Sequence, residues 1–165
     1  MSKSPFPGLS RVDHIGLTVP NLDAAVSFYT RVFGATELFR LGPFDSKQMP
    51  RMADGRDWTE AHLNVPDARL SIAMLQLCPN LRLELFRYEL PVDARTTPPR
   101  NCDVGGHHIA LRVDNLELAV EYLRSQDVRV MDGPIVVPSG PAAGLRAIYF
   151  MDPWGNQLEL VEYKG

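Results

Sequence analysis

Four side chains with metal-binding chemistry recur in matching positions of this chain. Residues 14–28 read HIGLTVPNLDAAVSF and residues 108–122 read HIALRVDNLELAVEY, with eight of fifteen positions identical. A second echo, RLEL at 82–85 and QLEL at 157–160, matches Glu84 with Glu159. Two His and two Glu suit Zn²⁺, Ni²⁺, Co²⁺, Mn²⁺ or Fe²⁺. On an octahedral ion, His14, Glu84, His108 and Glu159 would leave two adjacent positions for two vicinal substrate oxygens.

The elements that must position these residues follow from the same repeat. The alternating segment 12–19 predicts a strand. Asn21 then stands as a helix N-cap, apolar residues follow at helical spacing, and Gly34 ends the helix. Later strands are predicted at 36–41, 68–77 and 81–88. The second copy repeats the order, with Asn115 as cap and strands at 128–131, 145–151 and 157–163.

Each copy therefore reads as βαβββ, which predicts an α+β protein of two tandem modules. The first module spans 10–90 and the second spans 105–164, joined by a proline-containing linker at 91–104. The first copy is about 19 residues longer, and the surplus is expected at 41–66, a segment rich in Pro, Gly and Asp. That insertion would cover the mouth of the site or form a dimer contact.

Strand alternation predicts which way the candidate ligands point. The leucines around Glu84 and Glu159 would pack under the helices, so both carboxylates would point to the opposite face. His14 would share that face with Gly16 and Thr18. His107 would point to the helix side and is not expected to bind metal. Tyr149 and Arg112 are the side chains expected to contact substrate oxygens.

Composition excludes several classes of protein. The net charge is −3, which gives no general attraction to nucleic acid or anionic membranes. Two cysteines make no disulfide scaffold, and no segment is apolar enough for a signal peptide or a membrane span. We therefore expect a cytoplasmic protein that acts on a small molecule.

The chain resembles the vicinal oxygen chelate superfamily, which includes glyoxalases, epimerases, ring-cleaving dioxygenases and bleomycin resistance proteins. The resemblance rests on four segments and is most specific in the last: VDHIGLTVPNLDAAVSFYTRVFGA, LRLELFRYE, GGHHIALRVDNLELAVEYLR and IYFMDPWGNQLELVEY. It implies a glyoxalase-like fold whose paired modules curl as mixed sheets around one central divalent metal. It also implies that His14, Glu84, His108 and Glu159 are the ligands.

Within that superfamily, the sequence around the histidines is most similar to that of epimerase-type members, such as those acting on methylmalonyl-CoA or 2-epi-5-epi-valiolone. The function expected is a metal-dependent isomerase of an α-hydroxycarbonyl compound, with Glu84 and Glu159 moving the proton through an enediolate. The alternatives are a glyoxalase I-type lyase, an extradiol dioxygenase and a metal-free drug-binding protein. The resemblance also favours a homodimer.

Overall fold

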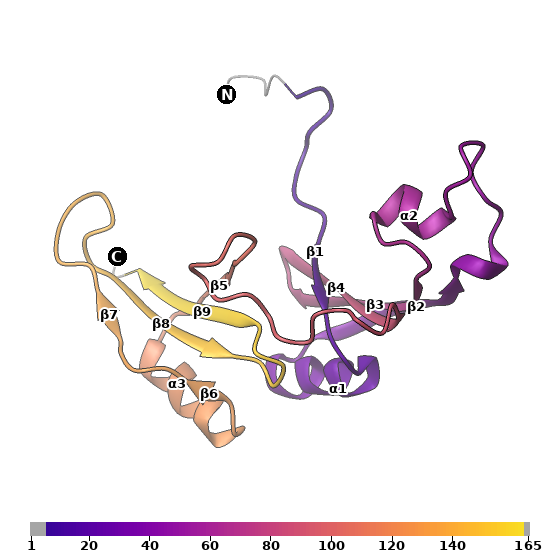
Figure 1. The fold of residues 1–165 in the computed structure, drawn as a ribbon. Helices are drawn as coiled ribbons and strands as arrows, with labels where there is room; N and C mark the ends of the chain where they lie inside the picture. The colour runs from indigo at the N-terminus through magenta and orange to yellow at the C-terminus, as the bar shows by residue number, and fades with distance from the viewer. Residues whose placement is uncertain (1–5, 164–165) are drawn as a thin grey trace. The chain divides into compact units, whose positions relative to one another are not determined.

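The computed structural model describes residues 6–163, which form two compact units that divide between Ala94 and Arg95 (Figure 1). Each unit has one mixed β-sheet and one long helix that packs against that sheet. This is the α+β architecture that the internal repeat predicts. No helix in the described part of the chain is long and apolar enough to cross a membrane.

The first unit contains a four-stranded sheet in the order β1-β4-β3-β2. Strand β1 pairs with β4 in parallel, and the other two pairings are antiparallel. Helix α1 packs against β2, β3 and β4. The elements are β1 (Ile15–Thr18), α1 (Leu22–Phe33), β2 (Thr36–Asp45), β3 (Arg69–Cys78) and β4 (Leu81–Leu90).

Helix α1 begins and ends at the predicted residues. The Asn21 side chain accepts a hydrogen bond from the Ala24 amide at 3.0 Å, which satisfies a donor that the first turn leaves unpaired. Gly34 ends the helix with a φ of 67°, a conformation that glycine adopts without strain. Leu83 and Leu85 on β4 are completely buried, as the predicted alternation requires.

Strand β2 is longer than predicted because it continues through Gly42-Pro43. The pairing register with β3 shifts between Leu41 and Phe44, so Gly42 and Pro43 form a bulge. Proline is tolerated there because β2 lies at the edge of the sheet. Gly42 has a φ of 99°, and a Cβ at this position would lie 2.9 Å from the Leu70 carbonyl oxygen.

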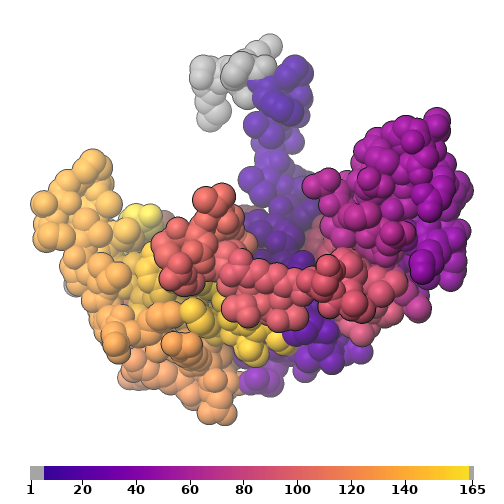
Figure 2. All heavy atoms as spheres, viewed as in Figure 1, coloured from indigo at the N-terminus to yellow at the C-terminus, as the bar shows by residue number. Residues whose placement is uncertain are grey.

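The insertion occupies residues 46–68, between β2 and β3, and forms a compact lobe (Figure 2, magenta). It contains the 3₁₀ turn η1 (Ser46–Gln48) and the helix α2 (Trp58–Leu63), neither of which the sequence predicted. The buried Asp57 carboxylate accepts hydrogen bonds from Thr59 Oγ1 and from the amides of Glu60 and Asp67. The Ser46 amide donates to the Ala68 carbonyl at 3.0 Å, which joins the two ends of the lobe.

The second unit contains a sheet in the order β5-β9-β8-β6, with β7 also paired to β8. Strand β5 is parallel to β9, and the remaining pairings are antiparallel. Strands β8 and β9 have the predicted boundaries, whereas the two-residue β7 was not predicted. The elements are β5 (Ile109–Arg112), α3 (Leu116–Ser125), β6 (Arg129–Val130), β7 (Ile135–Val136), β8 (Leu145–Met151) and β9 (Gln157–Tyr163).

The segment Asp152–Asn156 is the tight turn that joins β8 to β9. The buried Asp152 carboxylate accepts from the amides of Trp154 and Asn156 and from the Asn156 side chain, at 2.7–3.0 Å. Gly155 completes the turn with a φ of 88°. The turn fixes where β9 begins, and therefore where Glu159 lies along that strand.

Candidate metal centre

The first unit brings His14 and Glu84 together at the start of its parallel strand pair. His14 directly precedes β1, and Gly16 lies opposite Glu84 in the register of β1 with β4. The His14 Nε2 atom is 3.1 Å from Glu84 Oε2. The His14 side chain is 37% exposed and that of Glu84 is 19% exposed. Both groups are therefore partly buried yet open to a ligand.

The second unit repeats this arrangement with His108 and Glu159. His108 directly precedes β5, and Ala110 lies opposite Glu159 in the register of β5 with β9. The His108 Nε2 atom is 3.3 Å from Glu159 Oε2. Small residues, Gly16 and Ala110, occupy the equivalent positions beside the two carboxylates. Each unit thus builds one His–Glu pair from the same local pattern.

The separation of the two atoms in each pair suits neighbouring ligands of one metal ion. Metal bonds of about 2.1 Å at angles of about 90–109° place adjacent ligand atoms roughly 3.0–3.4 Å apart. The imidazole nitrogen and the carboxylate oxygen are also donors that divalent transition metals accept. Among residues 6–163, no three His, Cys, Asp or Glu side chains gather as a metal-binding group.

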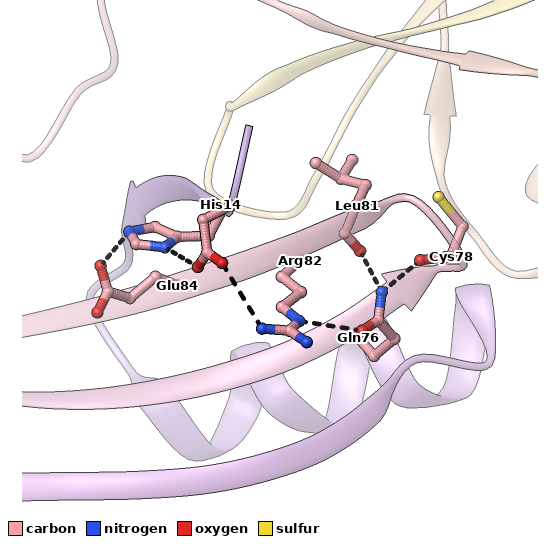
Figure 3. A network of polar contacts seen from close by, with 7 residues as sticks. His14, Gln76, Cys78, Leu81, Arg82 and Glu84 are labelled. Carbon is pink, nitrogen blue, oxygen red and sulfur yellow. Dashed lines mark hydrogen bonds and ion pairs between the residues drawn. The ribbon is translucent and has the colours of Figure 1, made fainter. Parts of the chain in front are cut away.

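His14 is held from its other ring nitrogen by a polar network that sequence reasoning missed (Figure 3). Its Nδ1 atom lies 2.9 Å from Asp13 Oδ1, and Asp13 Oδ2 lies 3.8 Å from the Arg82 guanidinium. Arg82 Nε donates to Gln76 Oε1 at 3.2 Å. The hydrogen bond with His14, aided by the charge of Arg82, lowers the pKa of Asp13. The adjacent Asp-His pair was the available signal in the sequence.

His108 and Glu159 are supported differently, by Tyr149 on β8. Tyr149 lies directly opposite Glu159 in the register of β8 with β9. Its ring meets the His108 ring edge-on, with centroids 5.3 Å apart. Burial raises the pKa of the Tyr149 phenol, and the Glu159 carboxylate raises it further by its charge and by accepting the phenol hydrogen bond. Tyr149, predicted to contact substrate, therefore also contacts a predicted ligand.

The other predicted substrate residue, Arg112, is exposed at the end of β5. Its guanidinium carbon lies 5.2 Å from the centroid of the Tyr163 ring, a cation–π contact. Because alternate residues of a strand share a face, Arg112 lies on the same face as Ala110. His107 differs from His108, since its Nδ1 lies 3.3 Å from the Gly105 carbonyl oxygen.

Aromatic side chains lie beyond Glu84 on the same face of β4. The rings of Phe86 and Tyr88 are stacked, with centroids 6.1 Å apart, and the Phe86 ring lies over Gly16. Burial raises the pKa of the Tyr88 phenol, and the negative charge of Glu84 adds to this effect. The first unit therefore places its carboxylate beside an apolar, aromatic surface.

Comparison with known proteins gives one family and several named relatives. The model of the Glyoxalase/Bleomycin resistance protein/Dioxygenase superfamily matches residues 11–160. A 2-epi-5-epi-valiolone epimerase from an Actinomyces species is 45% identical over 163 residues, which cover 98% of this chain and 84% of the relative. The mitochondrial methylmalonyl-CoA epimerase of Mus musculus is 29% identical over 128 residues, covering 76% of this chain and 58% of the relative.

Solved structures agree with the fold. A glyoxalase family protein from Bacillus cereus has a TM-score of 0.71 at 20% identity, covering 100% of this chain and 99% of its own. The fosfomycin resistance protein FosX from Listeria monocytogenes, solved with Mn(II) and sulfate, has a TM-score of 0.59 at 16% identity. That match covers 94% of each chain.

Proposed function

The chain belongs to the glyoxalase/bleomycin resistance protein/dioxygenase superfamily, and within it we propose that the protein is a metal-dependent epimerase of a small α-hydroxyketone. The 45% identity to a 2-epi-5-epi-valiolone epimerase over nearly the whole chain supports isomerase chemistry. It also supports a cyclic polyhydroxy ketone of the valiolone type as the substrate.

The observation that carries the proposal is the repeated His–Glu pair. We propose that His14 and Glu84 in the first unit, and His108 and Glu159 in the second, are the residues that bind divalent metal. The atom separations of 3.1 and 3.3 Å suit adjacent ligands. When bound, such an ion supplies Lewis-acid stabilisation of the negative charge that develops on the substrate oxygens.

Epimerisation then requires the chain to remove one proton and to return one to the opposite face of the same carbon. Glu84 and Glu159 are the two carboxylates available for these steps. One carboxylate takes the proton from the carbon that carries the hydroxyl group next to the ketone. The C–H electron pair then passes into the enediolate. The other carboxylate, or an acid that it orients, delivers a proton from the opposite side, so the net composition is unchanged.

The surroundings of the two carboxylates support different roles. Tyr149 lies opposite Glu159, so its phenol can donate a hydrogen bond to that carboxylate and restrain it. The equivalent position opposite Glu84 is Met74, which offers no strong donor. We therefore assign proton abstraction to Glu84, the less restrained carboxylate, and proton return to Glu159 with Tyr149. Arg112 is proposed to orient substrate hydroxyl groups.

The experiment that tests this function is solvent exchange followed by proton NMR. Metal-loaded protein is incubated with 2-epi-5-epi-valiolone in D₂O, and we expect epimerisation with deuterium entering at the reacting carbon. Glu84→Gln and Glu159→Gln should each lower kcat by about 10²- to 10⁴-fold, because proton transfer by a positioned side chain contributes that much. Methylmalonyl-CoA serves as the control substrate.

Three results would contradict the proposal. These are turnover that requires glutathione, oxygen consumption with a catechol, and full epimerase activity in both Gln variants. We further propose a homodimer in the cytoplasm. Cys78 and Cys102 are both unpaired, which suits a reducing compartment. Light scattering coupled to size-exclusion chromatography tests the dimer directly.

A further inference from the structure

We infer that Asp13 is a positioning residue that fixes the ring of His14 and selects the nitrogen it offers to metal. This inference rests on the proposed function, and it assigns a role to a residue outside the predicted ligand set. The His14 ring lies between two carboxylates, with Asp13 Oδ1 at Nδ1 and Glu84 Oε2 at Nε2. Figure 3 shows the His14 and Glu84 side chains of this arrangement.

The hydrogen-bonding capacities of these groups determine the direction of the contacts. An ionised carboxylate accepts hydrogen bonds only, so the 2.9 Å contact of Asp13 Oδ1 requires a proton on His14 Nδ1. In the neutral ring, Nε2 then presents an unshared electron pair toward Glu84 Oε2, 3.1 Å away. Two electron-rich atoms at that distance repel unless a proton on Nε2 or a bound cation offsets their charge. In the neutral ring with Nδ1 protonated, a divalent cation bound by both atoms meets that requirement.

Asp13 is itself held in place by the network behind it. Its second oxygen lies 3.8 Å from Arg82, and Arg82 Nε donates to Gln76. The Gln76 amide donates to the carbonyl oxygens of Cys78 and Leu81, at 2.5 and 3.1 Å. Those carbonyls flank the turn between β3 and β4. The orientation of His14 is therefore tied to the hairpin whose second strand carries Glu84.

The second unit lacks this device, which makes the inference specific to His14. The repeat places His107 where the first unit has Asp13. His107 lies against the Gly105 carbonyl, and the described part of that unit places no carboxylate at Nδ1 of His108. His108 instead has the edge of the Tyr149 ring beside it. The two histidines therefore reach the same pairing with Glu through different support.

The first readout is metal affinity of the whole chain. Ni²⁺ or Co²⁺ is titrated against a chromophoric chelator, with the parent, Asp13→Ala, Asp13→Asn and the matched control His107→Ala. Loss of a carboxylate that supports a metal-binding histidine typically costs 10- to 100-fold in affinity, so we expect a loss of about that size in Asp13→Ala. Asp13→Asn, which still offers an acceptor oxygen, should recover part of the affinity, and His107→Ala should bind like the parent.

The second readout needs no metal and no activity. In ¹⁵N-histidine-labelled, metal-free protein at about pH 9, well above the ordinary His pKa of about 6.5, NMR reports the tautomer of each neutral ring. We expect His14 to carry its proton on Nδ1 in the parent and to shift toward the Nε2-protonated tautomer in Asp13→Ala. His108 should be unchanged in that variant.

The outcomes separate this inference from the proposed function. An unchanged His14 tautomer in Asp13→Ala, or equal affinity losses in Asp13→Ala and His107→Ala, would overturn the role of Asp13. A parent protein that binds no divalent metal contradicts the metal-dependent function and the metal-selecting role together. In that case the tautomer of His14 still decides whether Asp13 orients the ring.

Discussion

Tyr149 lies directly across the β8–β9 strand pair from Glu159, and burial together with that carboxylate raises the pKa of its phenol. The equivalent pair in the first unit is Met74 and Glu84. Two carboxylates that the repeat makes equivalent in sequence therefore differ in the side chain that faces them, a thioether for Glu84 and a phenol for Glu159. An epimerase needs this kind of difference, because one group must release a proton where the other takes it up.

Removing the Tyr149 hydroxyl should slow catalysis without preventing metal binding. A hydrogen bond to a charged group contributes about 1.5–3 kcal/mol, so we expect Tyr149→Phe to lower kcat by roughly 10- to 100-fold. Steady-state kinetics with the metal content measured in parallel tests this. Met74→Leu is the matched control on the other side and should change kcat little. Equal losses in both variants would show that packing, rather than the hydroxyl, is responsible.

Divalent metal should stabilise the folded protein, and both histidines should be required. A ligand at 100 times its Kd stabilises by about 2.7 kcal/mol, which corresponds to a rise in Tm of roughly 5–10 °C for a chain of this size. We expect this rise with Ni²⁺, Co²⁺, Zn²⁺ or Mn²⁺ in thermal denaturation, and EDTA should abolish it. His14→Ala and His108→Ala should each remove most of the rise. A full rise in either variant would contradict the four-ligand site.

Arg112 should affect substrate binding more than the chemical step. Its guanidinium is exposed and lies over the Tyr163 ring. We expect Arg112→Met to raise KM about 10-fold with kcat within about 2-fold, as loss of uniform binding predicts. Arg129→Met, at an exposed strand position, is the control. A fall in kcat with unchanged KM would place Arg112 in the chemical step instead.

The 46–68 lobe should resist acid because of Asp57. Hydrogen bonds from the Asp67 amide, Thr59 and the Glu60 amide hold the pKa of Asp57 at about 2, below its ordinary value of 3.8. The stabilisation is therefore complete above about pH 4 and is lost as the pH falls through about 2. Trp58 fluorescence in a Trp154→Phe background reports the lobe, because Trp58 lies in it and stacks on Phe44 of β2.

The matched variant for that measurement is Asp57→Asn. It keeps an acceptor oxygen for the helix N-terminus but carries no charge to titrate. We expect its Trp58 signal to lack the acid transition between about pH 4 and pH 2 that the parent shows. The same transition in both proteins would mean that another carboxyl group controls the lobe.

Much of the fold could be predicted because the chain contains an internal repeat, whose two copies can be aligned with each other. The repeat aligned the two strand–helix starts, and Asn21 and Asn115 marked the helix caps in both copies. The 46–68 lobe has no counterpart in the second copy, so its helix had to be recognised from local signals alone. Asp57 and Glu60 form such a signal, an N-cap followed three residues later by Glu. Strand β2 was cut short because Gly-Pro ordinarily ends a strand, whereas an edge bulge accommodates it.

The residues of the candidate site also fall into those that the repeat predicts and those that it does not. The repeat pointed to His14, Glu84, His108 and Glu159, and each unit brings its own His and Glu within 3.3 Å. Asp13 was overlooked because its partner position is a histidine in the second copy. Comparison of the two copies identifies only residues that occur in both, so it cannot identify a side chain such as Asp13 that only the first copy has. The cross-strand register that sets Tyr149 against Glu159 also required knowledge of how the hairpin pairs.

The hydrogen bond between Ser46 and Ala68 closes the lobe at its base. The polypeptide therefore leaves the sheet and returns to it at neighbouring points, so the distance between the ends does not depend on the length of the segment. The entropy cost of closing a loop grows only slowly with its length, so a segment of this kind can be replaced by one of different length at little cost in stability. Evolution or an engineer can lengthen, shorten or replace it while the His14–Glu84 strand pair remains intact.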